Sequence, residues 1–282
     1  MPHLSALFCY PVKSCRGVAL DEASLDRRGI VHDREMMIVD ANDHQMTQRA
    51  TPVLAHIETA LTDDALLLRA PGAGELRVPW RVAAGEPSRP SREVVIWRDT
   101  VTADDTGDEA ARWLSDVIGQ PCRLVTTGKS SRRVRPAERL PEDLHPDARM
   151  RPVEIAFPDG FPLLVVSEES LDDLNRRLDL PEPLPMDRFR PNLVVASCEV
   201  PYAEDTWKAF RVGTVRLYAG GPCGRCIITT TDQQTLERSR EPLRTLAGYR
   251  RTGDGEVVFG QNAILAALGG RLRVGDEVAP EV

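Results

Sequence analysis

The sequence lacks a long hydrophobic run, and this absence argues against a membrane protein. The longest apolar runs, such as 163–166 and 193–196, are far shorter than the ~20 residues that a membrane-spanning helix needs. The first fifteen residues have no basic stretch ahead of their short apolar run, which argues against a secretory signal peptide. We therefore expect a cytoplasmic protein that does not bind a membrane.

Positive charge is also in deficit. The chain has 36 Lys and Arg residues against 43 Asp and Glu residues, which gives a net charge of −7. Proteins that bind nucleic acid usually carry a surplus of basic residues, so we do not expect nucleic acid as the main partner. The balance still allows a small anionic ligand held by a few arginines.

What the sequence does contain indicates a β-rich α+β protein. Its 41% hydrophobic and 28% charged residues are typical of a globular chain, and 282 residues favour two lobes over one core. Short strand-like runs separated by glycine and proline fill the first hundred residues and favour a barrel or a curled sheet. We expect a barrel-like lobe over residues 1–120 and a second β-barrel lobe, with a few flanking helices, over residues 121–282.

Two helices have recognisable starts. Thr106 and Glu109 have the spacing of a capping box, and Gly119 is placed to end the helix that follows. Ser167 is expected to cap a second helix, with glutamates in its first turn.

A basic segment, KSSRRVRPAER at 129–139, begins a proline-rich loop that extends to about residue 152. A solvated loop between the lobes is the plain interpretation. The sharper hypothesis is a docking site for an acidic redox partner, formed by Arg132, Arg133 and Arg135.

The six cysteines are scattered, except for Cys223 and Cys226 in the segment Gly220–Cys226. In a protein without an export signal we expect reduced thiols. A zinc site would need more ligands than this pair. A thioredoxin-like redox pair would need to stand at the start of a helix, but the residues that follow, 227–231, are β-branched and strand-like. A third interpretation is a single soft thiolate ligand or nucleophile favoured by Arg225, and a fourth is two inert thiols.

Arginines ahead of that segment offer a second indication. Arg188 and Arg190 stand just before an apolar strand, where they could form surface ion pairs or anchor a phosphate or carboxylate. Lys13, Ser14 and Arg34 add cationic and hydroxyl groups near the ends of other expected strands.

With these residues in view, the chain resembles the MOSC family, named for the C-terminal domain of molybdenum cofactor sulfurases. Its first 120 residues resemble the β-barrel domain that commonly precedes MOSC, and the remainder resembles MOSC itself. The matching segments run from residue 4 to residue 279 and include Tyr10–Cys15, Asp33-Arg34, Thr47–Arg49, Arg190–Asn192, Pro222–Cys226, Phe259–Gln261 and Val274–Asp276.

The resemblance is to members of the mitochondrial amidoxime-reducing component type, and it implies a molybdenum cofactor of the molybdopterin type. In such proteins the position of Cys226 ligates molybdenum and would be catalytic, whereas Cys223 is not expected to bind the metal. The other positions implied to hold the cofactor are Lys13, Ser14 and Arg34 for the pterin and its phosphate, and Asp159, Ser167, Arg190, Asn192 and Arg225 nearby.

The function implied is the reduction of N-hydroxylated compounds such as amidoximes, hydroxamates or hydroxylamines. No cysteine after Cys226 could hold an iron–sulfur cluster, so the electrons are expected from a separate protein such as a ferredoxin or a flavoprotein reductase. Pyridoxal phosphate is not expected, because no aminotransferase-like segment precedes residue 4. Gly224 stands where many animal relatives carry serine. The alternative function is a non-catalytic carrier of molybdenum cofactor or sulfane sulfur, with Cys226 as the acceptor.

Overall fold

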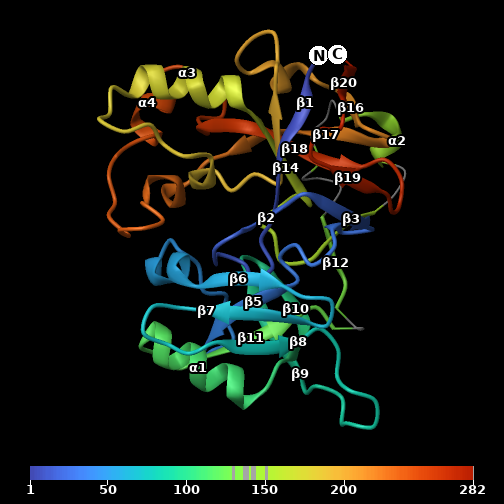
Figure 1. Cartoon of the computed structure of the whole chain (residues 1–282), viewed down its shortest axis with the longest axis vertical. Helices are drawn as coiled ribbons and strands as arrows, with labels where there is room; N and C mark the ends of the chain where they lie inside the picture. Colours follow the sequence, from blue (N-terminus) through green and yellow to red (C-terminus); the bar gives the residue numbers. More distant parts are fainter. Residues whose placement is uncertain (129–130, 136–139, 141–143, 150–151, 282) are drawn as a thin grey trace.

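The computed structural model describes residues 1–128, 131–135, 140, 144–149 and 152–281. Figure 1 shows two lobes stacked along the long axis, with the two chain ends side by side at the far end of one of them. One lobe carries α3, α4 and the long strands β14 to β18, and the other carries α1 and the strands β5 to β11. The twenty strands in the described ranges confirm the predicted β-rich class.

The larger lobe is built on an eight-stranded sheet with the order β2-β1-β15-β14-β18-β17-β16-β20. Its β14 and β15 are parallel, and the other neighbours are antiparallel. Its strands are β1 (His3–Cys9), β2 (Val18–Leu20), β14 (Leu163–Ser167), β15 (Leu193–Ala196), β16 (Ala209–Val212), β17 (Val215–Gly224), β18 (Val258–Leu265) and β20 (Val278–Glu281). The first strand of the chain is thus part of a sheet formed mainly by the second half.

The smaller lobe contains two antiparallel sheets, ordered β5-β11-β10-β9 and β6-β7-β8. One buried apolar cluster joins both sheets to the apolar face of α1, through residues such as Ile38, Leu66 and Leu114. The elements are β5 (Met36–Asp40), the 3-10 helix η1 (Pro52–His56), β6 (Glu58–Leu61), β7 (Ala65–Arg69), β8 (Leu76–Pro79), β9 (Ser91–Ile96), β10 (Asp99–Asp105), α1 (Asp108–Ile118) and β11 (Cys122–Thr126).

Short elements connect the lobes and cover the large sheet. The sheet β19-β3-β4 pairs a C-terminal strand with two N-terminal ones, and β12 pairs with β13. The bounds are β3 (Glu22–Asp26), β4 (Gly29–Ile30), β12 (Arg133–Arg135), α2 (Pro146–Arg149), β13 (Val153–Ile155), α3 (Glu168–Leu178), η3 (Met186–Arg188), η4 (Ala203–Thr206), η5 (Ile227–Thr230), α4 (Leu243–Ala247) and β19 (Arg271–Arg273). None of the helices in the described ranges is long and apolar enough to cross a membrane.

Of the two predicted helix starts, one is confirmed and the other is wrong. Ser167 is the N-cap of α3, and its hydroxyl accepts the Ser170 N–H at 3.1 Å, as predicted. The capping box at Thr106 is wrong, because Gly107 is the N-cap of α1 and makes no side-chain cap. The Thr106 hydroxyl instead donates to the Leu124 carbonyl oxygen in β11 at 3.0 Å. Gly119 ends α1 in the left-handed conformation, as predicted.

The predicted basic loop is only partly described, and residues 129–130 and 136–139 lie outside the described ranges. Arg133 is buried in β12 rather than solvated, so the prediction of a docking residue is wrong at this position. Its guanidinium pairs with Asp99 at 2.9 Å and donates to the Pro158 carbonyl oxygen at 2.6 Å. Burial of an arginine requires such partners, and they tie β12 to the β9–β10 hairpin.

Candidate functional site

Tyr10, just after β1, forms the centre of a buried group of cationic side chains. Two guanidinium groups lie over its ring, that of Arg34 at 4.4 Å and that of Arg190 at 4.3 Å from the ring centre. The Tyr10 hydroxyl donates to the Pro191 carbonyl oxygen at 3.0 Å. Cation–π contact of this kind holds an arginine beside an aromatic face without neutralising its charge.

Asp33 and Asn192 complete this group, and both are buried. Asp33 pairs with Arg34 at 2.5 Å and accepts the Tyr10 N–H at 2.8 Å. Asn192 donates to Asp33 at 3.0 Å and accepts from Arg34 at 3.0 Å. Burial raises the pKa of Asp33, although Arg34 opposes that shift. The structure therefore brings together Arg34, Arg190 and Asn192, three of the predicted cofactor-binding residues.

Three predicted site residues have a left-handed backbone, with φ of 67° at Ser14, 48° at Arg34 and 54° at Arg190. This conformation is uncommon for residues other than glycine. Such residues concentrate at ligand sites, where the surrounding structure holds them in place.

Two arginines of the site have no carboxylate partner in the part of the chain that the structure describes. Arg190 makes its contact with the Tyr10 ring, and burial lowers its pKa. Arg225 donates to the Cys223 sulfur at 3.1 Å and to the Phe189 carbonyl oxygen at 2.6 Å. The Nε atom of Arg225 is buried and has no hydrogen-bond partner. Partly buried guanidinium groups without an ion-pair partner favour binding of an anion.

Lys13 is buried at the start of the turn after β1, and its ammonium donates to the Phe157 carbonyl oxygen at 2.9 Å. It also forms an ion pair with Asp159, which pairs with Arg49 at 3.1 Å as well. Burial lowers the pKa of Lys13 despite this pairing. Partial desolvation of Asp159 is outweighed by Lys13 and Arg49, which hold the pKa of its carboxyl below the usual range. The lysine is therefore held beside the Arg34 group, since Phe157 N–H donates to the Arg34 carbonyl oxygen at 3.0 Å.

A glutamine pair joins the two lobes beside Ser14. The Gln48 side chain donates to the Ser14 carbonyl oxygen at 2.7 Å and to Gln233 at 3.0 Å. Gln233 in turn donates to the Thr231 carbonyl oxygen at 3.1 Å. Gln48 belongs to a segment that the sequence singled out, but its partner Gln233 was missed, because glutamine seven residues after Cys226 belongs to no recognised motif.

Cys226 follows β17 and is half-buried. It is the N-cap of η5, and its carbonyl oxygen accepts the Thr229 N–H at 3.1 Å and the Thr229 hydroxyl at 3.0 Å. The predicted strand over 227–231 is therefore wrong, since a 3-10 turn stands there. Within the described residues the Cys226 thiol has no hydrogen-bond partner, whereas the Cys223 sulfur is bound by Arg225. The two thiols differ in that only Cys226 is left available to a ligand.

Comparison with known proteins now decides the family. The model of the MOSC N-terminal beta barrel domain matches residues 1–121, and that of the MOSC domain matches residues 152–279. Mitochondrial amidoxime reducing component 2 of Bos taurus is 32% identical over 98% of this chain and 82% of its own length. The chain belongs to the MOSC family.

Two further relatives of this MOSC protein show the range of the family. Mitochondrial amidoxime-reducing component 1 of Homo sapiens is 34% identical over 98% of this chain and 82% of its own length. Molybdenum cofactor sulfurase of Oryza sativa subsp. japonica is 32% identical over 99% of this chain but only 35% of its own length. The MOSC protein therefore corresponds to about a third of the sulfurase and to most of the amidoxime-reducing components.

The residues present fit the molybdopterin-type cofactor that the family implies. The buried Nε of Arg225 lacks an acceptor, and an anionic oxygen would satisfy it. The Cys226 thiol supplies the soft ligand that molybdenum accepts. The predicted division into lobes at residue 120 stays a prediction, as do the individual roles of the site residues.

Ser167 makes its hydrogen bonds with Glu204 and Ser170 rather than with the other predicted site residues. It is fully buried, and its hydroxyl donates to Glu204 at 2.8 Å while it caps α3. Glu204 also accepts the Ser170 hydroxyl at 2.8 Å. The hydrogen bonds of Ser167 are therefore directed into the start of the helix, and its contact with a cofactor stays a prediction.

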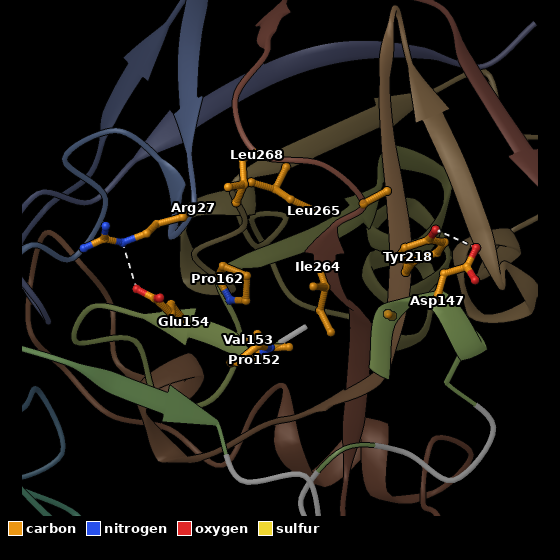
Figure 2. Close-up of a pocket in the computed structure, with 12 residues that line it drawn as sticks. Arg27, Asp147, Pro152, Val153, Glu154, Pro162, Tyr218, Ile264, Leu265 and Leu268 are labelled. Atoms are coloured by element: carbon orange, nitrogen blue, oxygen red, sulfur yellow. Dashed lines mark hydrogen bonds and ion pairs between the residues drawn. The ribbon is translucent and has the colours of Figure 1, made fainter. Parts of the chain in front are cut away.

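A small cavity of about 50 Å³ lies elsewhere in the MOSC protein, beside β13 and β18. Figure 2 shows its lining, in which Arg27 pairs with Glu154 on one side and Tyr218 donates to Asp147 on the other. None of the predicted site residues lines this cavity. It is too small for a cofactor or a drug-sized substrate.

Proposed function

We propose that this MOSC protein binds the molybdenum cofactor between its lobes and reduces N-hydroxylated compounds with electrons from a separate protein. The observation that carries the proposal is the pair Arg190 and Arg225, which lack carboxylate partners among the described residues. Arg225 precedes Cys226, whose thiol has no hydrogen-bond partner in the same ranges. The family and the similarity to the amidoxime-reducing components support the same cofactor.

The site residues divide the work of holding this cofactor. Cys226 supplies the thiolate ligand, and Lys13, Ser14 and Arg34 receive the pterin and its phosphate. Arg190, Asn192 and Arg225 hold the remaining polar groups, and Asp159 sets the orientation of Lys13. Charge-assisted hydrogen bonds from lysine and from forked guanidinium groups suit a phosphate better than neutral donors do.

The reaction takes a hydroxylamine-type substrate, two electrons and two protons to the amine and water, so that the N–O bond breaks and the oxygen leaves as water. When bound, the molybdenum centre supplies the redox couple for this step. The protein orients the substrate, keeps solvent from the cofactor and stabilises its negative charge with fixed cations. Lys13, Arg34 and Arg190 are held by Asp159, Asp33 and Tyr10, so they need no rearrangement.

The first experiment measures molybdenum and pterin in protein made by a host that produces the cofactor. We expect near-stoichiometric molybdenum in the unmodified protein, loss of it in Cys226→Ala, and retention in the matched control Cys223→Ala. Reduction of benzamidoxime by the loaded protein with a chemical reductant tests the activity. Loaded protein that reduces no N-hydroxylated compound would contradict the reductase, and full molybdenum in Cys226→Ala would contradict the ligand.

A second candidate function is a carrier of sulfane sulfur, favoured by the half-buried Cys226 thiol without a hydrogen bond and by the similarity to a molybdenum cofactor sulfurase. The mass of the intact protein distinguishes it. An adduct of one sulfur atom that disappears in Cys226→Ala, together with an absence of molybdenum, would favour the carrier.

A further inference from the structure

Glu256 lies just before β18, the strand that pairs with the end of β17 where the cysteine segment begins. β17 and β18 are antiparallel, and Gly224 pairs with Val258. The Arg225 N–H donates to the Val257 carbonyl oxygen at 2.7 Å, which continues that register by one residue. Cys226 comes just after Arg225 and Glu256 just before Val257, so both residues stand at the end of this pairing.

Gly224 leaves open the space into which the Glu256 side chain reaches. A Cβ atom on Gly224 would stand 2.7 Å from Oε2 of Glu256 and 3.2 Å from its carboxyl carbon. The Glu256 carboxylate thus lies against Gly224, and a side chain at position 224 would displace it.

The Glu256 carboxylate is available to a ligand. It is exposed, and across the described ranges it has neither a hydrogen-bond donor nor an ion-pair partner. The Arg225 guanidinium is directed away from it, to the Cys223 sulfur and the Phe189 carbonyl oxygen. An unpaired carboxylate beside the cysteine segment attracts a cation that approaches the same face.

We propose that Glu256 is a specificity-determining residue that selects N-hydroxylated substrates carrying a positive charge. This inference rests on the proposed function. The Glu256 carboxylate lies against Gly224, two residues before Cys226. The favoured substrates carry an ammonium or guanidinium group from which Glu256 accepts a charge-assisted hydrogen bond.

The test compares two amidoximes of similar shape, 4-(aminomethyl)benzamidoxime and the neutral 4-methylbenzamidoxime, on molybdenum-loaded protein. In Glu256→Gln we expect the ratio of kcat/KM for the cationic over the neutral compound to fall about tenfold, the effect of losing one charged hydrogen bond. Gly224→Ala should lower the ratio in the same direction. Asp254→Asn is the matched control, since it removes a charge from the same turn and keeps the acceptor for the Thr252 hydroxyl.

Each result decides the inference. An unchanged ratio in Glu256→Gln, in protein that still reduces 4-methylbenzamidoxime, overturns the role of Glu256 and leaves the reductase in place. Equal loss on both compounds also overturns it, because it shows a general effect on the site. Loaded wild-type protein that reduces neither compound contradicts the proposed function, and the inference fails with it. Added salt should weaken the preference for the cationic compound, since exposed charges are screened.

Discussion

Asp33 and Glu204 are both buried carboxyl groups, and burial raises the pKa of each, but their partners differ. Asp33 pairs with the Arg34 guanidinium at 2.5 Å. Among the described residues Glu204 has no ion-pair partner, and its carboxyl accepts from the hydroxyls of Ser167 and Ser170 and from the Ser167 N–H at 3.1 Å. Asp33 holds a cation beside the Tyr10 ring, and Glu204 accepts the hydroxyls at the start of α3.

The difference teaches which buried polar groups mark a site in this protein. The donors around Glu204 all have acceptors within the fold, so nothing is left for a ligand. Next to Asp33, the Arg190 guanidinium has no carboxylate partner in the ranges that the structure describes. We therefore expect an arginine without an ion-pair partner to be a better indication of a ligand site than a buried charge alone.

The largest effect on stability is expected for Glu204→Ala. The substitution removes the acceptors of three buried donors and leaves a cavity, so we expect a loss of about 3 kcal/mol in the free energy of unfolding. Denaturant unfolding measures it, with the exposed Glu199→Ala as the control, which should change by less than about 0.5 kcal/mol. Molybdenum per folded molecule should not change. Loss of molybdenum from a Glu204→Ala protein of unchanged stability would show that Glu204, like Asp33, serves cofactor binding.

Compared with Glu204→Ala, Asp33→Asn should lower the free energy of unfolding less and the molybdenum content more. The amide keeps an acceptor for Tyr10 N–H but leaves the Arg34 charge without its partner, for a loss of about 2 kcal/mol. Since Arg34 is then no longer held in place, molybdenum content should fall clearly. Metal analysis and denaturant unfolding on one preparation separate the two effects. Full molybdenum in this variant would show that Asp33 serves the fold alone, like Glu204.

Ser167→Ala tests whether Ser167 stabilises the fold, like Glu204, or helps to hold the cofactor, like Asp33. Its hydroxyl caps α3 and donates to Glu204, so we expect a loss of about 1.5 kcal/mol with molybdenum content retained. This expectation opposes the prediction from the family resemblance, which makes Ser167 a cofactor contact. Loss of molybdenum in a folded Ser167→Ala protein would uphold that prediction, and the exposed Ser197→Ala serves as the control.

Local patterns in the sequence predict a structural feature correctly when its hydrogen-bond partners are close along the chain. Ser167 was recognised as a cap because its partner, Ser170, is three residues away. Thr106 was misread because its hydroxyl binds Leu124, eighteen residues along the chain. The strand expected over 227–231 does not form, because the Thr229 and Thr230 hydroxyls turn back onto carbonyl oxygens within three residues.

The site was harder to derive than the β-rich class because it is assembled from distant segments. Gln48 and Gln233 are 185 residues apart, and Arg34 and Asn192 are 158 apart. Periodicity and turn chemistry carry no information on such pairs. The family resemblance included Tyr10 and Asp33 in its matching segments but gave a role only to Lys13, Arg34 and Arg190. That the Asp33 carboxylate holds Arg34 and the Tyr10 ring holds Arg190 is seen only in the structure.

The smallest expected effect is the pH dependence of stability, and it sharpens the comparison further. The pKa of each carboxyl is raised in the folded protein, so each contributes stability that is present below the unfolded-state pKa and lost as the pH rises through the folded-state pKa. Glu204→Gln should flatten the fall in unfolding free energy above about pH 4.5, by less than ~1.4 kcal/mol per pH unit. For Glu204→Gln, this change in the pH dependence should be the same in molybdenum-free and molybdenum-loaded protein.

For Asp33→Asn, the change in the pH dependence of the unfolding free energy should be larger in the loaded protein, because an anion bound at Arg34 opposes ionisation of Asp33. Equal behaviour of the two variants in both forms would show that Asp33 does not sense the ligand.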